Sequence, residues 1–195
     1  FTGIWPQRAF LHWRIQMANY VTAFNRVYQA GFSPNLVERP RLEKHLQAIL
    51  NDVVKMRGLI TPASKETHIQ KSIFEAIQTI SRNMICTLEL QTNAYWASRE
   101  SHFLMINAKA LRETQLMTHQ MLMAIAQALY EGNPSPVKAS RERLNEIIME
   151  LRALMKQEQH GPLQETSIHG YVWLTLEQAR QLELLSELIC KALRK

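Results

Sequence analysis

The chain has 195 residues, of which 46% are hydrophobic and 21% are charged, and its net charge is +6. This is enough for one domain with a core of its own. No stretch approaches the about 18 consecutive apolar residues of a membrane span. The basic residues are spread along the chain and alternate with glutamates from Glu38 onward. This pattern is typical of a solvated surface and disfavours a nucleic-acid-binding protein.

The composition favours helices over strands. The apolar residues are mainly Leu, Ala, Ile and Met, and the chain has only 6 Gly and 7 Pro. We therefore predict an all-α fold, an antiparallel bundle of about six helices, two or three of them long.

The first half of the chain predicts three helices. Apolar residues recur every three or four positions from Phe10 to Tyr28, and Gly31 and Pro34 end this pattern. A second helix is expected to begin at Pro40 and to be closed by Gly58 and Pro62. A third pattern runs over residues 69–95 without Gly or Pro.

The second half predicts three more helices. Ser98 or Ser101 offers an N-cap for the fourth, and the run EGNPSP at residues 131–136 separates it from the fifth. A connector follows at residues 160–174, for which an extended piece is expected at its end, from Tyr171 to Leu174. The sixth helix is expected to start with a capping box made of Thr175 and Gln178.

Catalytic and metal-binding motifs are missing from the sequence. No histidine lies three or four residues from another, no Glu-x-x-His pair is present, and no glycine-rich phosphate loop or nucleophile motif occurs. We expect no enzyme, no metal and no cofactor. Cys86 and Cys190 lie within apolar helical patterns, and we expect them to be buried, reduced thiols.

Four methionines lie close together in sequence, at Met105, Met117, Met121 and Met123. Thioether side chains repack easily, so they could form an adaptable binding groove. Core filling at helical spacing is the preferred interpretation.

The first residues resemble the flank of a membrane span. Trp5 and Pro6 precede a basic stretch with Arg8, Trp13 and Arg14, and no acidic residue occurs before Glu38. Indole rings favour the headgroup level, and positive charge near the end of a span places that end inside the cell. We predict that residues 1–6 are a membrane-interface stub and residues 7–195 one cytoplasmic bundle. The alternative is a soluble helix that simply begins with basic residues.

The segment NAYWASRESHF, residues 93–103, combines aromatic and cationic side chains. Tyr95, Trp96, Arg99 and His102 could receive the carboxylate of an aromatic acid. In the structural alternative, the aromatic rings pack the end of a helix and Arg99 covers them.

Several long segments carry a family resemblance. FTGIWPQRAFLHWRIQ, GFSPNLVERPRLEKHLQ, VKMRGLITPASKET and LELLSELICKALRK resemble the C-terminal part of inner-membrane proteins of the fusaric acid resistance-like (FUSC, or aromatic acid exporter) family. YWASRESHFLMINAKAL is similar to an element that recurs after the membrane half of that family. The present sequence keeps Trp96, Arg99 and Asn107 but lacks the denser arginines of many relatives.

The resemblance implies a function and a location. It implies about six transmembrane helices before Phe1, a domain facing the cytoplasm at the inner membrane, and export of small compounds such as aromatic acids. A structural, oligomerisation or gating role is expected for the domain, with its own transmembrane part as partner. The alternative role is a ligand-sensing module that binds the exported acid. We also expect a homo-oligomer, since Trp5, Phe10 and Trp13 would offer apolar surface.

Overall fold

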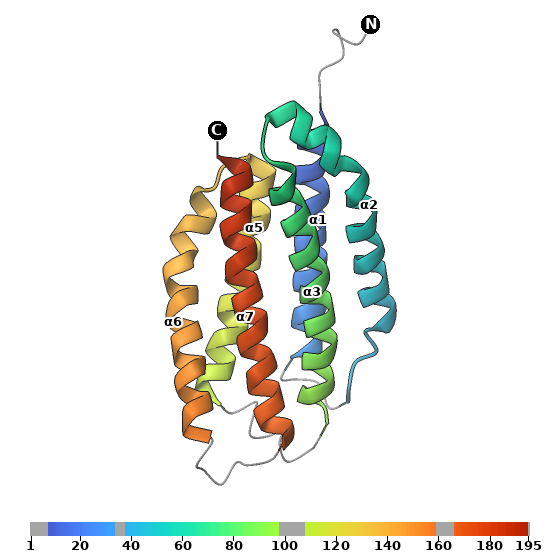
Figure 1. The fold of residues 1–195 in the computed structure, drawn as a ribbon. Helices are drawn as coiled ribbons and strands as arrows, with labels where there is room; N and C mark the ends of the chain where they lie inside the picture. The colour runs from blue at the N-terminus through green and yellow to red at the C-terminus, as the bar shows by residue number, and fades with distance from the viewer. Residues whose placement is uncertain (1–7, 34–37, 98–107, 159–165, 195) are drawn as a thin grey trace, which may run out of the picture.

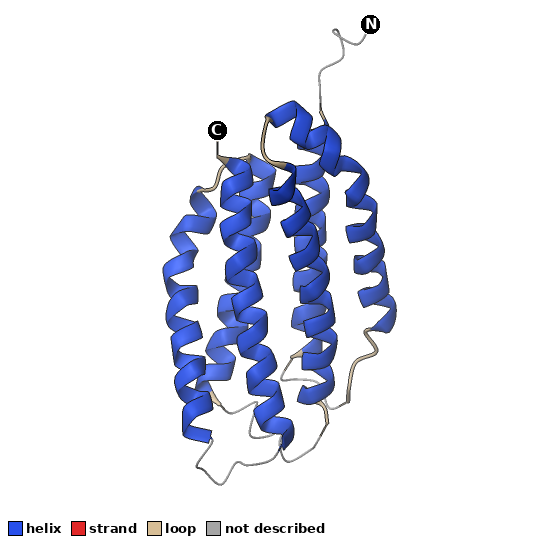
Figure 2. Ribbon diagram, in the orientation of Figure 1, coloured by secondary structure: helices blue, strands red, loops and turns tan. Residues whose placement is uncertain are grey.

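The computed structural model describes residues 8–33, 38–97, 108–158 and 166–194. Within these ranges the chain forms six helices and no strand, which confirms the predicted all-α bundle (Figure 2). The helices are α1 (Ala9–Gly31), α2 (Glu43–Thr67), α3 (Lys71–Tyr95), α5 (Lys109–Glu131), α6 (Ser135–Glu158) and α7 (Thr166–Leu193). Two or three long helices were expected, but each of these six has 23 to 28 residues.

The six helices form two groups of three that are consecutive in the chain. Neighbours around the bundle follow the order α1, α2, α3, α7, α6, α5 and back to α1. The first helices of the two groups, α1 and α5, therefore pack together, and so do the last helices, α3 and α7. Each of these pairs is antiparallel (Figure 1). The two groups are thus related by an approximate twofold rotation about an axis perpendicular to the bundle, although their sequences show no obvious repeat.

One continuous core fills the bundle. It contains the apolar stripe predicted for the first helix, and Trp13 is 1% exposed. The Trp13 ring meets Phe74 of α3 edge-on, with the ring centroids 4.9 Å apart. Of the methionine cluster, Met117 and Met121 are core residues, as expected, and Met123 is exposed. Met105 lies outside the described residues.

The predicted end of α2 is wrong, because the helix continues through Gly58 and Pro62 to Thr67. Proline lacks the N–H that would bond the carbonyl of the residue four positions earlier, which here is Gly58, and its ring crowds that carbonyl. Such a site bends a helix without ending it when packing supports both sides. Ile60 and Ala63 are both buried, and the last turns of α2 lean over the start of α1 (Figure 1).

The predicted start of the last helix is also wrong. Tyr171–Leu174 is helical, since α7 already begins at Thr166. Thr175 and Gln178 are therefore interior residues and not a cap, and both are buried against α3. Thr175 Oγ1 accepts a hydrogen bond from Gln91 Nε2 at 3.2 Å, and Gln178 Nε2 donates to the Met84 carbonyl at 3.1 Å. These polar contacts join the two groups of helices along the α3–α7 seam.

The cysteine prediction holds for one residue of two. Cys190 is buried, whereas Cys86 is exposed on α3, and neither forms a disulfide. Burial raises the pKa of the Cys190 thiol, against the opposing effect of Arg141, Lys138 and Arg194. A thiol of raised pKa carries little thiolate, so Cys190 is a core residue and not a nucleophile.

Candidate functional site

The end of the bundle where α1 starts and α7 finishes is the first candidate site (Figure 1). It contains three of the five residues predicted for a membrane interface, Arg8, Trp13 and Arg14. Trp5 and Pro6 lie outside the described residues. Arg8 is exposed just before α1, whereas Trp13 is buried in the core and unavailable to lipid in this structure. Burial of Trp13 also removes one of the apolar surfaces on which self-association was expected.

Arg14 is half-buried and packs against the end of α5. Its guanidinium carbon lies 5.6 Å from the centroid of the Phe10 ring. On its other side the guanidinium touches Gly132, where an added Cβ atom would collide with Arg14 Nη1. A cation at this place is favourable because the carboxyl end of a helix carries partial negative charge. Arg14 Nε is buried and has no hydrogen-bond partner within the described part of the chain.

Glu66 fixes the first turn of α1, and sequence reasoning missed this residue. Its Oε2 accepts hydrogen bonds from the backbone N–H groups of Ala9 at 2.9 Å and Phe10 at 3.3 Å. The first N–H groups of a helix have no partner inside the helix, so a carboxylate there replaces the missing cap. The bend of α2 at Pro62 brings Glu66 to this position. No spacing rule connects residues 57 positions apart, which is why the sequence could not reveal the contact.

A groove with a volume of about 550 Å³ opens beside this end. Phe10, Arg14, Gly132, Leu193 and Arg194 are among the residues that line it. It therefore combines apolar walls with two guanidinium groups, a mixture that suits contact with another chain or with an amphipathic surface better than chemistry.

The aromatic and cationic patch predicted at residues 95–102 is the second candidate. Tyr95 is buried, and burial raises its pKa to about 12. Trp96 is half-buried, packs edge-on against Tyr95 with centroids 5.4 Å apart, and donates from Nε1 to the Gly31 carbonyl at 3.0 Å. Both rings close the end of the bundle, as the structural alternative predicted. Arg99 and His102 lie outside the described residues.

The space beside Trp96 is too small for an aromatic ring. The cavity there has a volume of about 30 Å³ and is lined by Arg39, Leu42, Glu89 and Thr92 as well as Trp96. This volume admits about one or two water molecules. Within the described residues, the patch therefore offers no room for an aromatic acid.

The interior near this end holds a cluster of tyrosines. Tyr28 is fully buried, and burial raises its pKa to about 12 although contacts with Thr118 and Gln91 act in the other direction. Burial also raises the pKa of Tyr171, whose ring centroid lies 5.3 Å from that of Tyr95. These hydroxyls stay protonated at neutral pH. They are hydrogen-bonding groups of a packed core.

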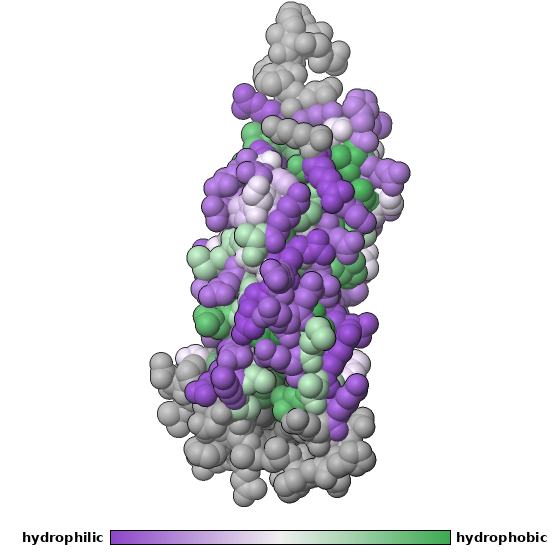
Figure 3. Space-filling view, turned by 90° about the vertical axis from the view of Figure 1, so that its left-hand side faces the viewer, coloured by the Kyte–Doolittle hydropathy of each residue, from purple (hydrophilic) through white to green (hydrophobic). Residues whose placement is uncertain are grey.

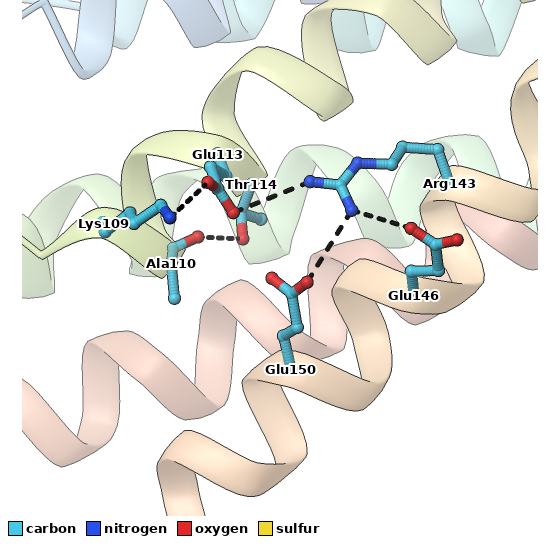
Figure 4. Close-up of polar contacts among 7 residues, drawn as sticks. All are labelled: Lys109, Ala110, Glu113, Thr114, Arg143, Glu146 and Glu150. Carbon is cyan, nitrogen blue, oxygen red and sulfur yellow. Dashed lines mark hydrogen bonds and ion pairs between the residues drawn. The ribbon is translucent and has the colours of Figure 1, made fainter.

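The densest group of charges lies on the outside of α5 and α6 (Figure 4). Arg143 reaches Glu146 at 2.8 Å, Glu113 at 3.6 Å and Glu150 at 3.7 Å, and Lys109 pairs with Glu113 at 3.7 Å. The carboxylates, above all the hydrogen-bonded Glu146, raise the pKa of Arg143. Each of these side chains is at least one third exposed, so water screens the attraction and the network adds little stability. It joins two neighbouring helices and forms no catalytic arrangement.

Metal-binding clusters and membrane spans can be assessed over the same ranges. No group of three or more His, Cys, Asp or Glu side chains that could hold a metal ion occurs within residues 8–33, 38–97, 108–158 and 166–194. Over the same part of the chain, none of the helices has both the length and the apolar character needed to cross a bilayer.

These observations describe a helical bundle held together by apolar packing, aromatic contacts and buried polar hydrogen bonds. The sequence is very similar to that of a known protein. The chain is 64% identical over all 195 residues to the Inner membrane protein YeeA of Escherichia coli (strain K12). The match covers 100% of this chain and 55% of the length of that protein. No family model matches the chain, so membership of the fusaric acid resistance-like family stays a prediction. No solved structure matches it either.

Proposed function

We propose that this bundle is the cytoplasmic domain of an inner-membrane protein and that it passes mechanical force between subunit contacts and a membrane-embedded part that exports small compounds. The similarity to a protein named for the inner membrane, which extends well beyond the matched region, supports the first half of the proposal. The fusaric acid resistance-like resemblance supports export as the activity of the membrane part. We propose no enzymatic activity for the domain.

The hydrogen bonds between Glu66 and the first turn of α1 are the observation that supports the proposed transmission of force. The two amides held by Glu66 tie the first turn of α1 to α2, and the Trp13–Phe74 contact one turn later ties it to α3. Helix α1 has 23 residues in all, which at about 1.5 Å per residue span about 34 Å of the bundle. A displacement of the residues before Ala9 would therefore move α1 as a rigid rod instead of unwinding its first turn.

Substitution of Glu66 in the full-length protein tests this role. In cells lacking the wild-type gene, the Glu66→Ala protein should give lower tolerance to aromatic carboxylic acids than the wild-type protein at equal membrane abundance. The matched control is Glu75→Ala, which removes an exposed glutamate whose only ion pair among the described residues is with Lys71 at 3.7 Å. Equal tolerance for Glu66→Ala and wild type would contradict the mechanical role. Equal tolerance for wild type and a gene deletion would contradict export of these acids.

The proposed location has a separate test. A fluorescent protein fused after Lys195 should fluoresce, and alkaline phosphatase at the same place should stay inactive, if the domain faces the cytoplasm. The reverse result would contradict that location whatever the outcome of the Glu66 experiment.

The ligand-sensing role stays a weaker proposal. It requires the aromatic acid to bind near Trp96 with Arg99 and His102 as partners. Titration of the chain with aromatic carboxylates, followed by tryptophan fluorescence, should show a saturable change that Arg99→Ala abolishes. The absence of any saturable change would rule out sensing at this patch.

A further inference from the structure

The outer face shared by α1 and α5 has a stripe of exposed residues at the spacing used by helices that pack together. The stripe residues on α5 are alternately four and three positions apart, and those on α1 follow the same spacing. We call this surface the α1–α5 face, and its residues are Ile15, Asn19 and Thr22 on α1 and Leu116, Gln120, Met123, Gln127 and Tyr130 on α5; Thr22 is half-buried and the others are exposed. Steps of three and four residues keep side chains on one side of a helix, which is the pattern of a helix–helix seam. Within the described chain no helix covers this seam.

The stripe side chains are large and well exposed. Ile15 is 39% exposed, Leu116 58%, Met123 56% and Tyr130 50%. Between the two helices lies a groove with a volume of about 370 Å³, whose wall includes Thr22 and Met123. The face is therefore both apolar in its main side chains and hollowed along its centre.

The approximate twofold relation between the halves of the bundle applies to this face. Counted back from Gly31 at the end of α1 and Gly132 after α5, Ile15 corresponds to Leu116, Asn19 to Gln120, and Thr22 to Met123. Ile15 and Leu116 are both apolar, Asn19 and Gln120 both carry amides, and Thr22 and Met123 both line the groove. Two side-chain hydrogen bonds join α1 and α5, one on each side of the middle of their contact. Tyr130 donates to Asn19 Oδ1 at 2.7 Å, and the Asn25 side-chain amide lies 2.9 Å from His119 Nδ1.

Charge is absent from the face over several turns of both helices. No Asp, Glu, Lys or Arg occurs between Arg14 and Arg26 on α1 or between Glu113 and Glu131 on α5. By contrast, the exposed residues of α6 are mostly charged, and Figure 3 shows that side of the molecule covered mainly by hydrophilic side chains. Depletion of charge with enrichment in Met and Tyr distinguishes the centre of a protein–protein interface from ordinary surface.

We propose that the α1–α5 face is the surface through which two copies of this chain associate. The chain carries a net charge of +6, so two copies repel one another less when they meet at a surface without cations than at a basic one. The face also fits its own copy chemically. The amides of Asn19 and Gln120, which lie on opposite sides of its centre, both donate and accept, and the twofold relation repeats the same pattern on both helices. An isologous contact requires such a self-complementary surface.

A lipid occupant fits the face less well. Three of its eight residues are Asn or Gln, and burying an amide in hydrocarbon without a hydrogen-bond partner costs several kcal/mol. A protein surface can supply partners for these amides. The size of the face agrees with a weak, reversible dimer: two helices about 10 Å wide over about 22 Å of length offer about 440 Å² per copy, or about 880 Å² for both copies, which lies below the size of standard specific interfaces and in the range of transient ones.

Sedimentation velocity of the 195-residue chain tests the proposal. Between about 10 and about 500 µM the wild-type chain should shift from monomer to dimer, in the range expected for an interface of this size. Met123→Glu, which places a carboxylate at the centre of each copy's face, should weaken the association about tenfold or more because the two carboxylates are buried together. Met123 is exposed in the monomer, so circular dichroism and the melting temperature of this variant should stay unchanged.

Met149→Glu is the matched control, since Met149 is 70% exposed on α6, outside the proposed contact. It should dimerise like the wild-type chain. A wild-type chain that stays monomeric over the whole concentration range would overturn the proposal. Dimers that tolerate Met123→Glu, or that are lost equally in Met149→Glu, would place the contact elsewhere and overturn it too.

Disulfide trapping gives an independent readout. With Cys86 replaced by serine, Gln120→Cys places a thiol near the centre of the face, and mild oxidation should link two copies. The native chain carries an exposed Cys86 on α3, and the α3–α7 seam lies on the opposite side of the bundle from α1 and α5. Oxidation of the native chain should therefore yield few linked dimers. Efficient linkage through Cys86 and none through Gln120→Cys would contradict the proposed face. None of these outcomes depends on export or on membrane location.

Discussion

Tyr28 places a titratable hydroxyl in the interior of the bundle, beside side chains of α3 and α5. Burial disfavours the phenolate and raises the Tyr28 pKa to about 12 from an ordinary value of 10.0. A raised pKa in the folded chain means that the unfolded chain loses its proton first as the pH rises. The stabilisation is therefore complete below pH 10 and is lost as the pH approaches 12.

We predict that the free energy of unfolding falls between about pH 10 and about pH 12, with a contribution from Tyr28 of about 3 kcal/mol. Tyr28→Phe removes this titrating group, so its loss of stability over that range should be smaller than that of the wild-type chain. Urea unfolding at a series of alkaline pH values measures both. Phe24→Leu, another buried change on α1, should keep the wild-type dependence on pH. Identical pH profiles for Tyr28→Phe and wild type would show that Tyr28 does not ionise in this way.

The residues of the candidate site show what one sequence can reveal. Tyr95 and Trp96 stood out because they lie beside the cationic residues Arg99 and His102 in the sequence, and the structural alternative for them follows from ordinary helix packing. Glu66 did not stand out, since one glutamate among many carries no signal until α2 bends and brings it to the start of α1. Trp13 fits two sequence patterns, since an indole beside arginines is typical of a membrane flank and the same residue belongs to the apolar stripe of α1. In the structure it packs against Phe74.

At the scale of the helices, the sequence predicted which segments are helical better than it predicted where each helix begins and ends. Apolar periodicity identified all six helices because each must bury one face. Glycine and proline were less informative about where a helix ends. Helix α2 continues through both Gly58 and Pro62 because the turns on either side of them pack against the core. Similarly, the aromatic and β-branched residues of Tyr171–Leu174 favour extended structure locally. The segment is helical because the helical conformation buries Tyr171 and Val172 in the core.

Two glycines with different surroundings should respond oppositely to alanine. Gly132 has φ 68°, and an added Cβ would meet Arg14 Nη1, whereas a Cβ at Gly58 meets nothing within 4 Å. Gly132→Ala should therefore lower the free energy of unfolding by about 1 kcal/mol or more, and Gly58→Ala should raise it by about 0.5 to 1 kcal/mol. For a chain of this length, about 1 kcal/mol corresponds to a shift of about 2 to 4 °C in the melting temperature. A stabilised Gly132→Ala variant would show that Arg14 and the left-handed cap adapt freely.

The whole molecule combines two three-helix groups that share one core. Periodicity alone could not show this, since it identifies the buried face of each helix and not its neighbour. The order of the helices around the bundle depends on contacts such as Gln91–Thr175 and Asn25–His119, each between residues more than 80 positions apart. For the same reason the α1–α5 face could not be recognised from the sequence. Its residues look like an ordinary helix surface until both helices lie side by side.

The shared core predicts that neither group of helices is stable alone. Residues 1–97 would expose the sides of α1 and α3 that now pack against α5 and α7, and residues 108–195 would expose the matching sides. Each fragment should therefore show low helical content and no cooperative melting by circular dichroism. The intact chain should unfold in one cooperative transition because every seam between the groups is lost together. An equimolar mixture of the two fragments should recover helical signal in proportion to complex formation. If either fragment melts cooperatively at the temperature of the intact chain, the bundle consists of two independent domains, and α1 would carry no force beyond its own three helices.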